Sequence, residues 1–505
     1  MELLTQRYKE KIAGIISCYD RVIITGTLPR LCYAQGMSNY LYEKGIRIFD
    51  YTKFAEPFAR RLRENAQAIA KANGIEVEYL RKASISKEKR VQEYLLQRGH
   101  KPGLVCILSV METCEKYKPW YNKKSQKSYL IAETGKCLHY YFYFIDEQFG
   151  LCYVRVPTWC PFRLQIYFNG HNWLANQLDK AAISYRLLDN AFIEIEDFDK
   201  AQTLADEFYS KALHTLLDKF ADTYCPIYGD FEQTYHWSIL QAEYSLDIVF
   251  KKQEDLQPIY DQLVTTAIHT VKPENIATFL GRKLDGKYQA EVGNRYNVRL
   301  EGSRIRHSMG NNSIKMYDKF SHILRIETTT NNVSFFKHYR RVEHQDGTSS
   351  RKYAAMKKNI YSLGSLKDCL KAANRRYLEF ISAIEDRRVG RDKLTKISTS
   401  VTENNRSYKG FNFFDEQDLK LLYSILRGEF NISGFQNKHL KSFLPQKSSG
   451  QISRLLKRMR THGLIKRIGK TYKYYLTKLG KHVILTALKI KELVIIPELD
   501  YAKTT

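Results

Sequence analysis

A long basic segment without a single acidic residue constrains this chain more than any other feature. Between Asn431 and Ile490 there are fourteen Lys or Arg residues and neither Asp nor Glu. Apolar residues recur there at helical spacing among candidate helix caps and a glycine turn, so we expect a folded module rather than a disordered tail. A folded module with charge of one sign needs a polyanion to neutralise it, and DNA is the commonest one.

The order of predicted elements in this module resembles a winged helix-turn-helix domain of the MarR-like kind. Candidate N-caps for its helices are Asp415, Asn437, Ser448 or Ser449, and Thr477. The third helix ends at Gly463, and two strand-like runs, Leu464–Ile468 and Tyr472–Leu476, follow it. The resemblance implies that the third helix contacts the major groove of DNA and that the hairpin reaches a phosphate or the minor groove.

Polar and basic side chains on the third helix and the hairpin are the candidate DNA ligands. The helical ones lie opposite the apolar positions of the helix or beside that face. The full set is Gln451, Arg454, Lys457, Arg458, Arg460, Lys470 and Lys473. Such faces are often simply solvated, and some winged helices dock on proteins. The absence of acidic residues over the whole segment favours DNA.

The composition of the whole chain indicates a soluble protein of several domains in a reducing compartment. With 505 residues we expect two to four domains, and the basic module supplies about half of the formal charge of +27. Nine cysteines are scattered without a CxxC pair, which argues against a zinc ribbon and a disulfide framework. No apolar run of about eighteen residues occurs, so we expect no membrane span and a cytoplasmic location.

We expect an α+β body, with a mixed or antiparallel sheet and helices, ahead of the winged helix. The predicted parts are an N-terminal α+β domain, an α+β core, a linker and the winged helix, at residues 1–210, 211–386, 387–412 and 413–492. The linker is inferred because that stretch is polar and nearly free of large apolar residues. Further predicted elements are the strands Arg21–Leu28 and Ile276–Leu280, the helix Pro57–Asn73, and the hairpin of Leu138–Asp146 and Leu151–Val156.

Two carboxylates in the apolar run Trp237–Phe250 are the first sign of chemistry in the body. Glu243 and Asp247 are four residues apart, so they share a face whether the run is a strand or a helix. Close carboxylates in apolar surroundings repel each other, and a divalent cation relieves that repulsion. Farther along, Glu327 alternates with apolar neighbours and so projects from the face opposite theirs. Ordinary ion pairs with neighbouring Lys and Arg residues are the simpler alternative.

The order of these residues resembles the catalytic core of rolling-circle replication initiation factors, over residues 235–331. Besides the paired acids, the matching pieces are Phe279–Gly281, Ser313–Lys319 and Leu324–Thr328. The resemblance implies a nickase of DNA that uses Mg²⁺ or Mn²⁺ and a tyrosine nucleophile. In this comparison the metal ligands are Glu243, Asp247 and Glu327.

Two tyrosines are candidates for the nucleophile, and two cations for stabilising the transition state. Tyr317 lies in the matching strand, whereas Tyr339 sits among basic residues that can hold a phosphate and lower the pKa of a phenol. Lys319 and Arg325 would stabilise the charge that develops on the phosphate. The predicted catalytic set is therefore Glu243, Asp247, Tyr317, Lys319, Arg325, Glu327 and Tyr339.

Weaker signals leave other interpretations open. Asp20, just ahead of the predicted strand, is either the first acid of an RNase H-like site or a residue that caps the strand. The aromatic strand His139–Phe144 either stacks bases or fills a core, and His307 sits in a basic segment that could contact phosphate. We predict a DNA-binding protein of mobile-element type: a nickase, replication initiator, transposase or relaxase. The alternatives are a non-enzymatic DNA-binding regulator whose body senses a signal or forms a homodimer, and an RNA-binding protein.

Overall fold

The computed structural model divides the chain into two compact units, which are described separately. Unit 1 comprises Met1–Ala383 and unit 2 comprises Ile384–Thr505. The residues described are 2–81, 86–99, 101–208, 210–284, 288–299, 302–383, 387–427, 429–430, 434–469, 471–496 and 499. Within these ranges, every helix is too short or too polar to cross a membrane.

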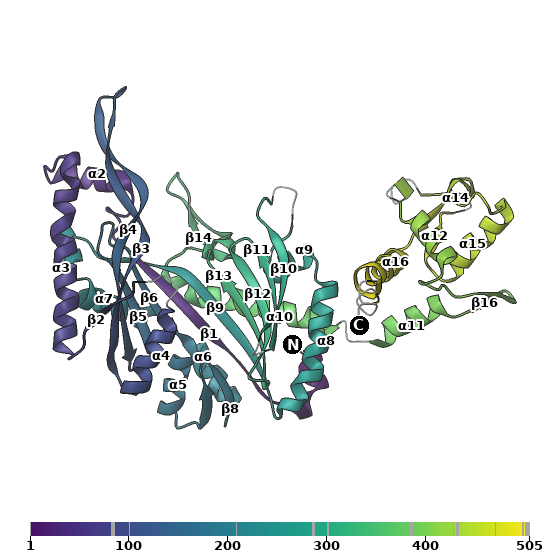
Figure 1. Cartoon of the computed structure of the whole chain (residues 1–505), viewed down its shortest axis with the longest axis horizontal. Coiled ribbons are helices and arrows are strands. Elements are labelled where there is room, and N and C mark those ends of the chain that lie inside the picture. The colour runs from purple at the N-terminus through teal and green to yellow at the C-terminus, as the bar shows by residue number, and fades with distance from the viewer. Residues whose placement is uncertain are drawn as a thin grey trace. The chain divides into compact units, whose positions relative to one another are not determined.

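Unit 1 is built on one sheet of eleven strands, in the order β10-β11-β12-β13-β9-β1-β6-β5-β4-β3-β2 (Figure 1). Neighbouring strands are antiparallel except for the short pairing of β2 with β3. The strands are β1 Ile12–Thr27, β2 Val77–Tyr79, β3 Gly103–Asn122, β4 Lys127–Asp146, β5 Gly150–Pro157, β6 Leu164–Asn169, β9 His236–Phe250, β10 Val292–Arg299, β11 Gly302–Met309, β12 Asn312–Lys319 and β13 Ile323–Thr330. Two hairpins are separate from the sheet: β7 Tyr185–Leu188 with β8 Ala191–Ile195, and β14 Lys337–Glu343 with β15 Ser349–Ala355.

Helices cover both faces of this sheet. They are α1 Glu2–Arg7, α2 Ala34–Glu43, α3 Tyr51–Ala72, α4 Lys87–Arg98, α5 Gly170–Lys180, α6 Phe198–Asp206, α7 Ser210–Tyr224, α8 Gln253–Thr270, α9 Pro273–Phe279 and α10 Leu363–Ala383. Short 3₁₀ helices occupy Lys9–Lys11, Ile48–Asp50, Pro226–Phe231, Val333–Phe335 and Ile360–Ser362.

The alternation of side chains along the strands gives the sheet two differently covered faces. On the first face, Tyr244 of β9 joins a large core to which α3, α7, α8 and α10 contribute. On the second face, α5 and α6 cover β1 through Ile16 and Cys18, and α4 covers the far strands. Glu243 and Asp247 have the opposite parity to Tyr244, so both belong to the second face.

The α+β class with a large mixed sheet is confirmed, but no division falls near residue 210. The strands that precede and follow that position belong to the same sheet, because β1 pairs with both β6 and β9. The predicted strand Ile276–Leu280 is wrong. This segment lies in or next to α9, where Pro273 occupies the first turn, a position that favours the start of a helix.

Other predicted elements agree with the structure. The predicted aromatic hairpin is formed by β4 and β5, with Gly150 at a φ of 62° in the connection. The predicted helix Pro57–Asn73 is the larger part of α3. The predicted strand at Arg21–Leu28 is the second half of β1, which begins earlier, at Ile12.

Unit 2 has its own hydrophobic core and begins with structure where a linker was expected. Its elements are α11 Arg387–Ser398, β16 Val401–Glu403, β17 Arg406–Tyr408, α12 Glu416–Ile425, α14 Asn437–Phe443, α15 Ser449–Thr461, β18 Ile465–Arg467, β19 Tyr474–Leu476, α16 Lys478–Ile490 and a π-helix Lys491–Ile495. The prediction of a linker at 387–412 is wrong, because Ile397 and Phe411 are buried in the core of unit 2 and hold this segment in place.

The helix caps of unit 2 follow the sequence signals closely. The side chains of Asp415, Ser448 and Thr477 accept hydrogen bonds from the backbone at the starts of α12, α15 and α16. The second helix differs by one residue, since Gln436 is its N-cap and Asn437 is its first residue. The core beneath these helices includes Leu422, Leu440, Leu456 and Ile484, and among the described residues it shares none with the cores of unit 1.

Candidate active site

Three carboxylates from three neighbouring strands meet on the second face of the sheet. Asp20 comes from β1, Glu243 from β9 and Glu327 from β13, and one oxygen atom of each lies within 4.8 Å of the others. The strand register explains how the two glutamates meet. Glu243 lies opposite Thr329, and Glu327 lies opposite Ser245, which makes the glutamates diagonal neighbours on one face. We call Asp20, Glu243 and Glu327 the acidic cluster.

A β-bulge in β1 brings Asp20 to the acidic cluster. The pairing with β9 shifts between Tyr19 and Val22, so that Asp20 and Arg21 together lie opposite the single residue Glu243. A bulge of this kind bends the strand and changes the direction of a side chain. Asp20 therefore lies within a strand and contributes to a cluster, and the interpretation that it caps the strand is wrong.

The start of α5 fits closely against this bulge. A Cβ atom at Gly170 would lie 2.2 Å from the carbonyl oxygen of Tyr19, so only glycine permits the approach. The approach places Asn169 beside the acidic cluster, where its Nδ2 donates to Asp20 Oδ1 over 3.3 Å. Asn190 donates to the same oxygen over 2.5 Å. These amides hold the Asp20 carboxylate in a fixed orientation.

The pKa values of Glu243 and Asp20 are shifted in opposite directions. Burial raises the pKa of Glu243, and the negative charge of Glu327 raises it further. Burial also acts to raise the pKa of Asp20, but a hydrogen bond with His171 and the charge of Arg325 outweigh it and hold that pKa well below its usual range. Asp20 is therefore ionised at neutral pH, and Glu243 is destabilised by its neighbours when it ionises.

Lys315 of β12 places one positive charge inside the acidic cluster. Its Nζ lies 2.6 Å from Glu327 Oε1 and 3.5 Å from Glu243 Oε1. The side chains of Lys315 and Glu243 are 16% and 12% exposed, against 3% for Glu327, so solvent reaches the cluster from their side. Lys315 therefore serves the two glutamates, whereas the charges near Asp20 are those of Arg325 and His171.

Asp247, which the sequence grouped with Glu243 as a metal ligand, is instead paired with Arg325. Arg325 donates to it from Nε over 2.7 Å and from Nη2 over 2.6 Å, and both side chains are fully buried. Burial acts to raise the pKa of Asp247, but Arg325 lowers it overall. His171 lies between the two aspartates, with Nδ1 3.2 Å from Asp20 and Nε2 3.7 Å from Asp247. The four-residue spacing correctly predicted that Asp247 lies on the same face as Glu243. Asp247 is neutralised by the buried Arg325 of β13, however, and not by a metal ion shared with Glu243.

The position of Arg325 also corrects its predicted role. A fully buried guanidinium does not reach a bound phosphate, so Arg325 acts on the site through Asp247 and Asp20. Its Nη1 has no hydrogen-bond partner among the described residues and lies 3.8 Å from Asp20 Oδ1. Arg325 is therefore a positioning residue that fixes the charge of the two aspartates.

The remaining catalytic candidates lie in three different environments. The hydroxyl of Tyr317 donates to Glu327 Oε2 over 2.7 Å, and burial together with the Glu327 charge raises its pKa well above the usual value. Lys319 pairs with Asp189 over 3.1 Å, and burial lowers its pKa. Tyr339 is 67% exposed on the hairpin β14–β15. The structure thus joins Tyr317 to the acidic cluster as a hydrogen-bond donor, whereas Lys319 is held by a different acid.

A row of cations continues from Lys315 across the second face of the sheet. In the strand register Lys315 lies opposite Arg306 of β11, and Arg306 lies opposite Arg295 of β10. Directly opposed residues of adjacent strands share a face, so this basic row runs outward from the acidic cluster. Arg306 Nε is a buried donor without a hydrogen-bond partner among the described residues. An anion with several oxygen atoms would supply the acceptor that Arg306 Nε lacks.

Two weaker candidates belong to the hydrophobic core. His307 is fully buried, with its ring nitrogens 2.7 Å from Asn294 Oδ1 and 2.9 Å from the Tyr377 hydroxyl. Burial lowers its pKa to about 4, so the predicted phosphate contact is wrong. The aromatic strand His139–Phe144 is buried throughout, which confirms the core interpretation and leaves no exposed ring there for a base.

In unit 2, one predicted DNA ligand is used to hold the unit together. Arg458 donates to Asp418 over 2.8 and 2.9 Å, and its guanidinium lies 3.9 Å from the centre of the Phe411 ring. The prediction that Arg458 contacts DNA is therefore wrong. The spacing within α15 shows that Arg458 lies beside Arg454. That spacing does not reveal Asp418 on the neighbouring helix α12.

The other predicted ligands of unit 2 remain at or near its surface. Gln451 and Arg454 are exposed on α15. Lys457 forms an ion pair with Glu403 over 3.0 Å and is 30% exposed. Arg460 and Lys473 are half-buried, and Lys470 lies outside the described residues.

Sequence reasoning did not assign any residue besides the acids to the site around Asp20; His171 was considered only as a possible partner of stacked bases. His171, Asn169 and Asn190 come from segments that carry no recognisable motif, and their approach depends on the bulge in β1. The usable signal in the sequence was Asp20, which precedes a β-branched run. An aspartate in that position is typical both of the end of a strand and of a strand in an active site.

Comparisons with known proteins provide no relative from which a role could be transferred. A scan against protein-family models, a search of curated proteins and a search of solved structures each returned no match. Three carboxylates offer hard oxygen donors, the kind that Mg²⁺ and Mn²⁺ prefer, and one oxygen atom of each lies within 4.8 Å of the others.

Proposed function

We propose that this protein is a metal-dependent enzyme that cuts or transfers strands of DNA, of the kind encoded by mobile elements. The observation that carries the proposal is the meeting of Asp20, Glu243 and Glu327 from three adjacent strands, with a basic row beside them. Such an arrangement suits a phosphodiester, whose charge the basic row would bind and whose reacting phosphorus a metal ion would activate.

Each residue of the site has a role in this proposal. Asp20, Glu243 and Glu327 would hold Mg²⁺ or Mn²⁺, which supplies Lewis-acid activation of the scissile phosphate. Lys315 would move from the carboxylates to the phosphate, and Arg306 would bind a neighbouring phosphate. Tyr317 keeps Glu327 oriented through its hydroxyl. Its raised pKa disfavours the phenolate that a nucleophile needs.

Unit 2 supports the proposal through its order of elements. Three helices, a basic hairpin and a closing helix follow one another, and Phe435 pairs with Tyr474 beside the hairpin. This order resembles a winged helix, in which α15 would lie in the major groove with Gln451 and Arg454 toward the bases. In the proposal, unit 2 selects the DNA site and unit 1 carries out the chemistry.

The proposal is tested by nicking of supercoiled plasmid in the presence of Mn²⁺. We expect the wild-type chain to convert the plasmid to open circles, and Glu243→Gln or Asp20→Asn to lower the rate by about 100-fold or more, the scale on which loss of one charge-stabilising group acts. Glu133→Gln is the matched control, because this glutamate lies on β4 in a surface ion pair with Lys118. Mn²⁺ binding, followed by the electron paramagnetic resonance signal of the free ion, should fall in the two site variants alone.

A non-enzymatic DNA-binding regulator is the second candidate, and one observation favours it. Lys315 already lies within hydrogen-bonding distance of Glu327, so part of the charge of the acidic cluster is neutralised without a metal ion. A chain that binds duplex DNA through unit 2 but neither nicks plasmid nor takes up Mn²⁺ would establish this candidate and exclude the enzyme.

A further inference from the structure

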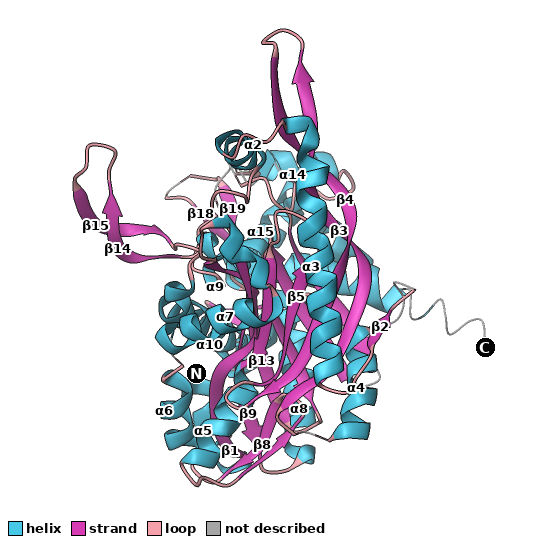
Figure 2. Ribbon diagram, turned by 90° about the vertical axis from the view of Figure 1, so that its left-hand side faces the viewer, coloured by secondary structure: helices cyan, strands magenta, loops and turns pink. Residues whose placement is uncertain are grey.

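The hairpin β14–β15 is an exposed arm that combines aromatic and basic side chains. It extends away from the sheet of unit 1 (Figure 2). Tyr339 and Tyr353 are directly opposite each other in its register and are 67% and 65% exposed. The next pair on the same face is Arg341 with Arg351. Large exposed aromatic rings cost hydration free energy, and a pair of them flanked by cations indicates a binding surface.

The charge of this arm is strongly positive. Residues 337–355 contain five Lys or Arg residues and two acidic ones, Glu343 and Asp346. Asp346 is used within the turn, where it accepts hydrogen bonds from Thr348. The bonds of two of the arginines are also internal to the hairpin, since Arg340 donates to Ala355 O and Arg341 to Ser349 Oγ. None of these partners is charged, so the positive charge is available to an external anion.

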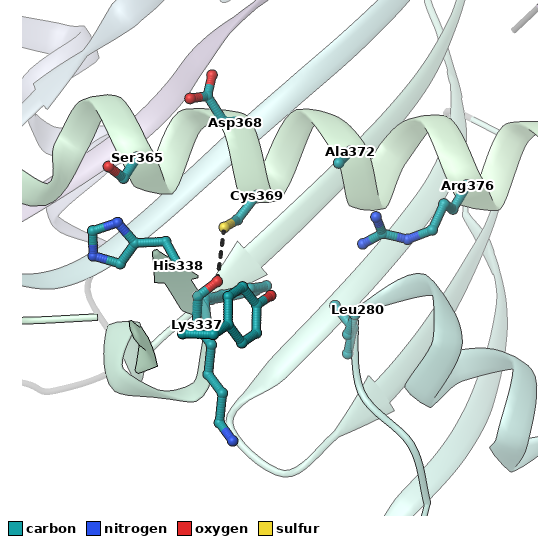
Figure 3. A pocket seen from close by; sticks show the side chains of 11 residues that line it. Leu280, Lys337, His338, Ser365, Asp368, Cys369, Ala372 and Arg376 are labelled. Atoms are coloured by element: carbon teal, nitrogen blue, oxygen red, sulfur yellow. Dashed lines mark hydrogen bonds between the residues drawn. The ribbon is translucent and has the colours of Figure 1, made fainter. Parts of the chain in front are cut away.

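A pocket opens at the base of the same hairpin, against α10 (Figure 3). Its volume is about 300 Å³, at the lower end of the range for ligand pockets. Leu280 contributes an apolar part of the lining, while Lys337, Tyr353 and Arg376 bring charge and an aromatic ring. The Arg376 guanidinium is held in position by the carbonyl oxygen of Phe279, at 2.9 and 2.5 Å. Tyr353 therefore belongs both to the exposed face of the arm and to the lining of the pocket.

We propose that this hairpin and the pocket at its base bind single-stranded DNA. The inference rests on the proposed function, because a nicked or melted site supplies a single strand next to unit 1. Tyr339 and Tyr353 would stack on successive bases, the paired arginines would contact the backbone phosphates, and one base would enter the pocket. Stacking on exposed tyrosines requires unpaired bases, and a pocket likewise admits a base only after it has left the duplex. This selects a single strand over a duplex.

The test is fluorescence anisotropy of the full chain with a labelled oligodeoxythymidylate of about twenty nucleotides, long enough for several binding modules. The buffer contains EDTA, so that no metal-dependent step contributes. We expect the double variant Tyr339→Ala/Tyr353→Ala to raise the Kd at least about tenfold, since each stacked base contributes appreciably to affinity. Ala372→Phe, which fills the pocket, should also raise it.

Two controls separate recognition from loss of folding. Tyr339→Phe/Tyr353→Phe keeps the rings and should retain the wild-type affinity. Tyr42→Ala removes another exposed tyrosine, 85% exposed on α2, and should leave the Kd unchanged. An unchanged Kd in the double alanine variant would overturn the inference. So would equally effective competition by duplex DNA, or tighter binding of oligouridylate.

Failure of this inference can be told apart from failure of the proposed function, because binding of the oligonucleotide and nicking of plasmid are measured separately. The variant Glu243→Gln should bind the oligodeoxythymidylate as the wild-type chain does, even where it fails to nick plasmid. Conversely, loss of binding in the tyrosine variants with normal uptake of Mn²⁺ would show that the arm and the acidic cluster act separately.

Discussion

At the scale of single residues, the site is governed by how each buried charge is balanced. Asp247 has its own counterion in Arg325, and Glu327 has Lys315. Glu243 shares Lys315 at a longer distance, and burial together with the nearby Glu327 carboxylate moves its pKa upward. A group held in an unfavourable charge state inside a folded protein is typical of functional sites rather than of structural ones.

This imbalance predicts that Glu243→Gln makes the protein more stable at neutral pH. The folded-state pKa of Glu243 is raised above its unfolded value, so ionisation of this residue lowers the stability at every pH above that unfolded value, about 4.3. The neutral glutamine avoids this cost, and we expect a higher Tm than wild type at pH 7. The difference should shrink as the pH falls below about 4, where glutamate is protonated in both states.

Thermal unfolding followed by circular dichroism at both pH values checks this prediction, and Glu133→Gln is the control at a surface position. Added Mn²⁺ should raise the Tm of the wild-type chain and leave that of Glu243→Gln unchanged, because only a ligand that binds the folded state stabilises it. A lower Tm for Glu243→Gln than for wild type at pH 7 would contradict the prediction that ionised Glu243 destabilises the folded protein.

At the scale of elements, the contact between α5 and the bulge of β1 positions Asp20. The amide of Asn169 and the ring of His171 reach Asp20 only because Gly170 lies against the Tyr19 carbonyl. Gly170→Ala would force these backbones apart, and we expect it to cost about 1–3 kcal/mol of stability, as overpacking does. Chemical denaturation measures this cost, and binding of Mn²⁺ should weaken in parallel.

Gly364→Ala is the matched control for that substitution. Gly364 lies in α10, and a Cβ atom there would meet nothing within 4 Å. Alanine in a helix restricts the unfolded chain, so this variant should be neutral or more stable by up to about 1 kcal/mol. Equal losses of stability in both variants would show that the close approach of α5 is not the cause.

Local sequence patterns predicted the helices and strands of this protein better than the contacts between them. Alternation and spacing identified β13 and the face shared by Glu243 and Asp247, and cap residues located the helices of unit 2. Asp20 was misplaced because the bulge depends on the register between β1 and β9, which lie far apart in the chain. The roles of Asp247 and Arg458 were missed for a similar reason, since each is decided by a charge on another element.

At the scale of the whole molecule, two separate cores indicate two unfolding events. The core of unit 2 contains Leu456, and the main core of unit 1 contains Ile248, each almost fully buried. We expect calorimetry of the full chain to resolve two transitions. Leu456→Ala should lower the free energy of unfolding of unit 2, and Ile248→Ala that of unit 1, each by about 2–5 kcal/mol. Each variant should therefore shift only one of the two transitions to lower temperature. A single transition that both variants shift equally would show that the units unfold as one.

The position of Lys315 has a consequence for the order in which partners would arrive. This ammonium and a metal ion compete for the same two glutamates, so the ion binds more weakly while the lysine occupies them. A phosphate bound along Arg306 and Arg295 offers the lysine another partner. Nucleic acid and metal would then each strengthen the binding of the other by the same factor, because linkage between two sites is reciprocal. Such synergy would make the chain bind the free ion more weakly alone than when its substrate is in place.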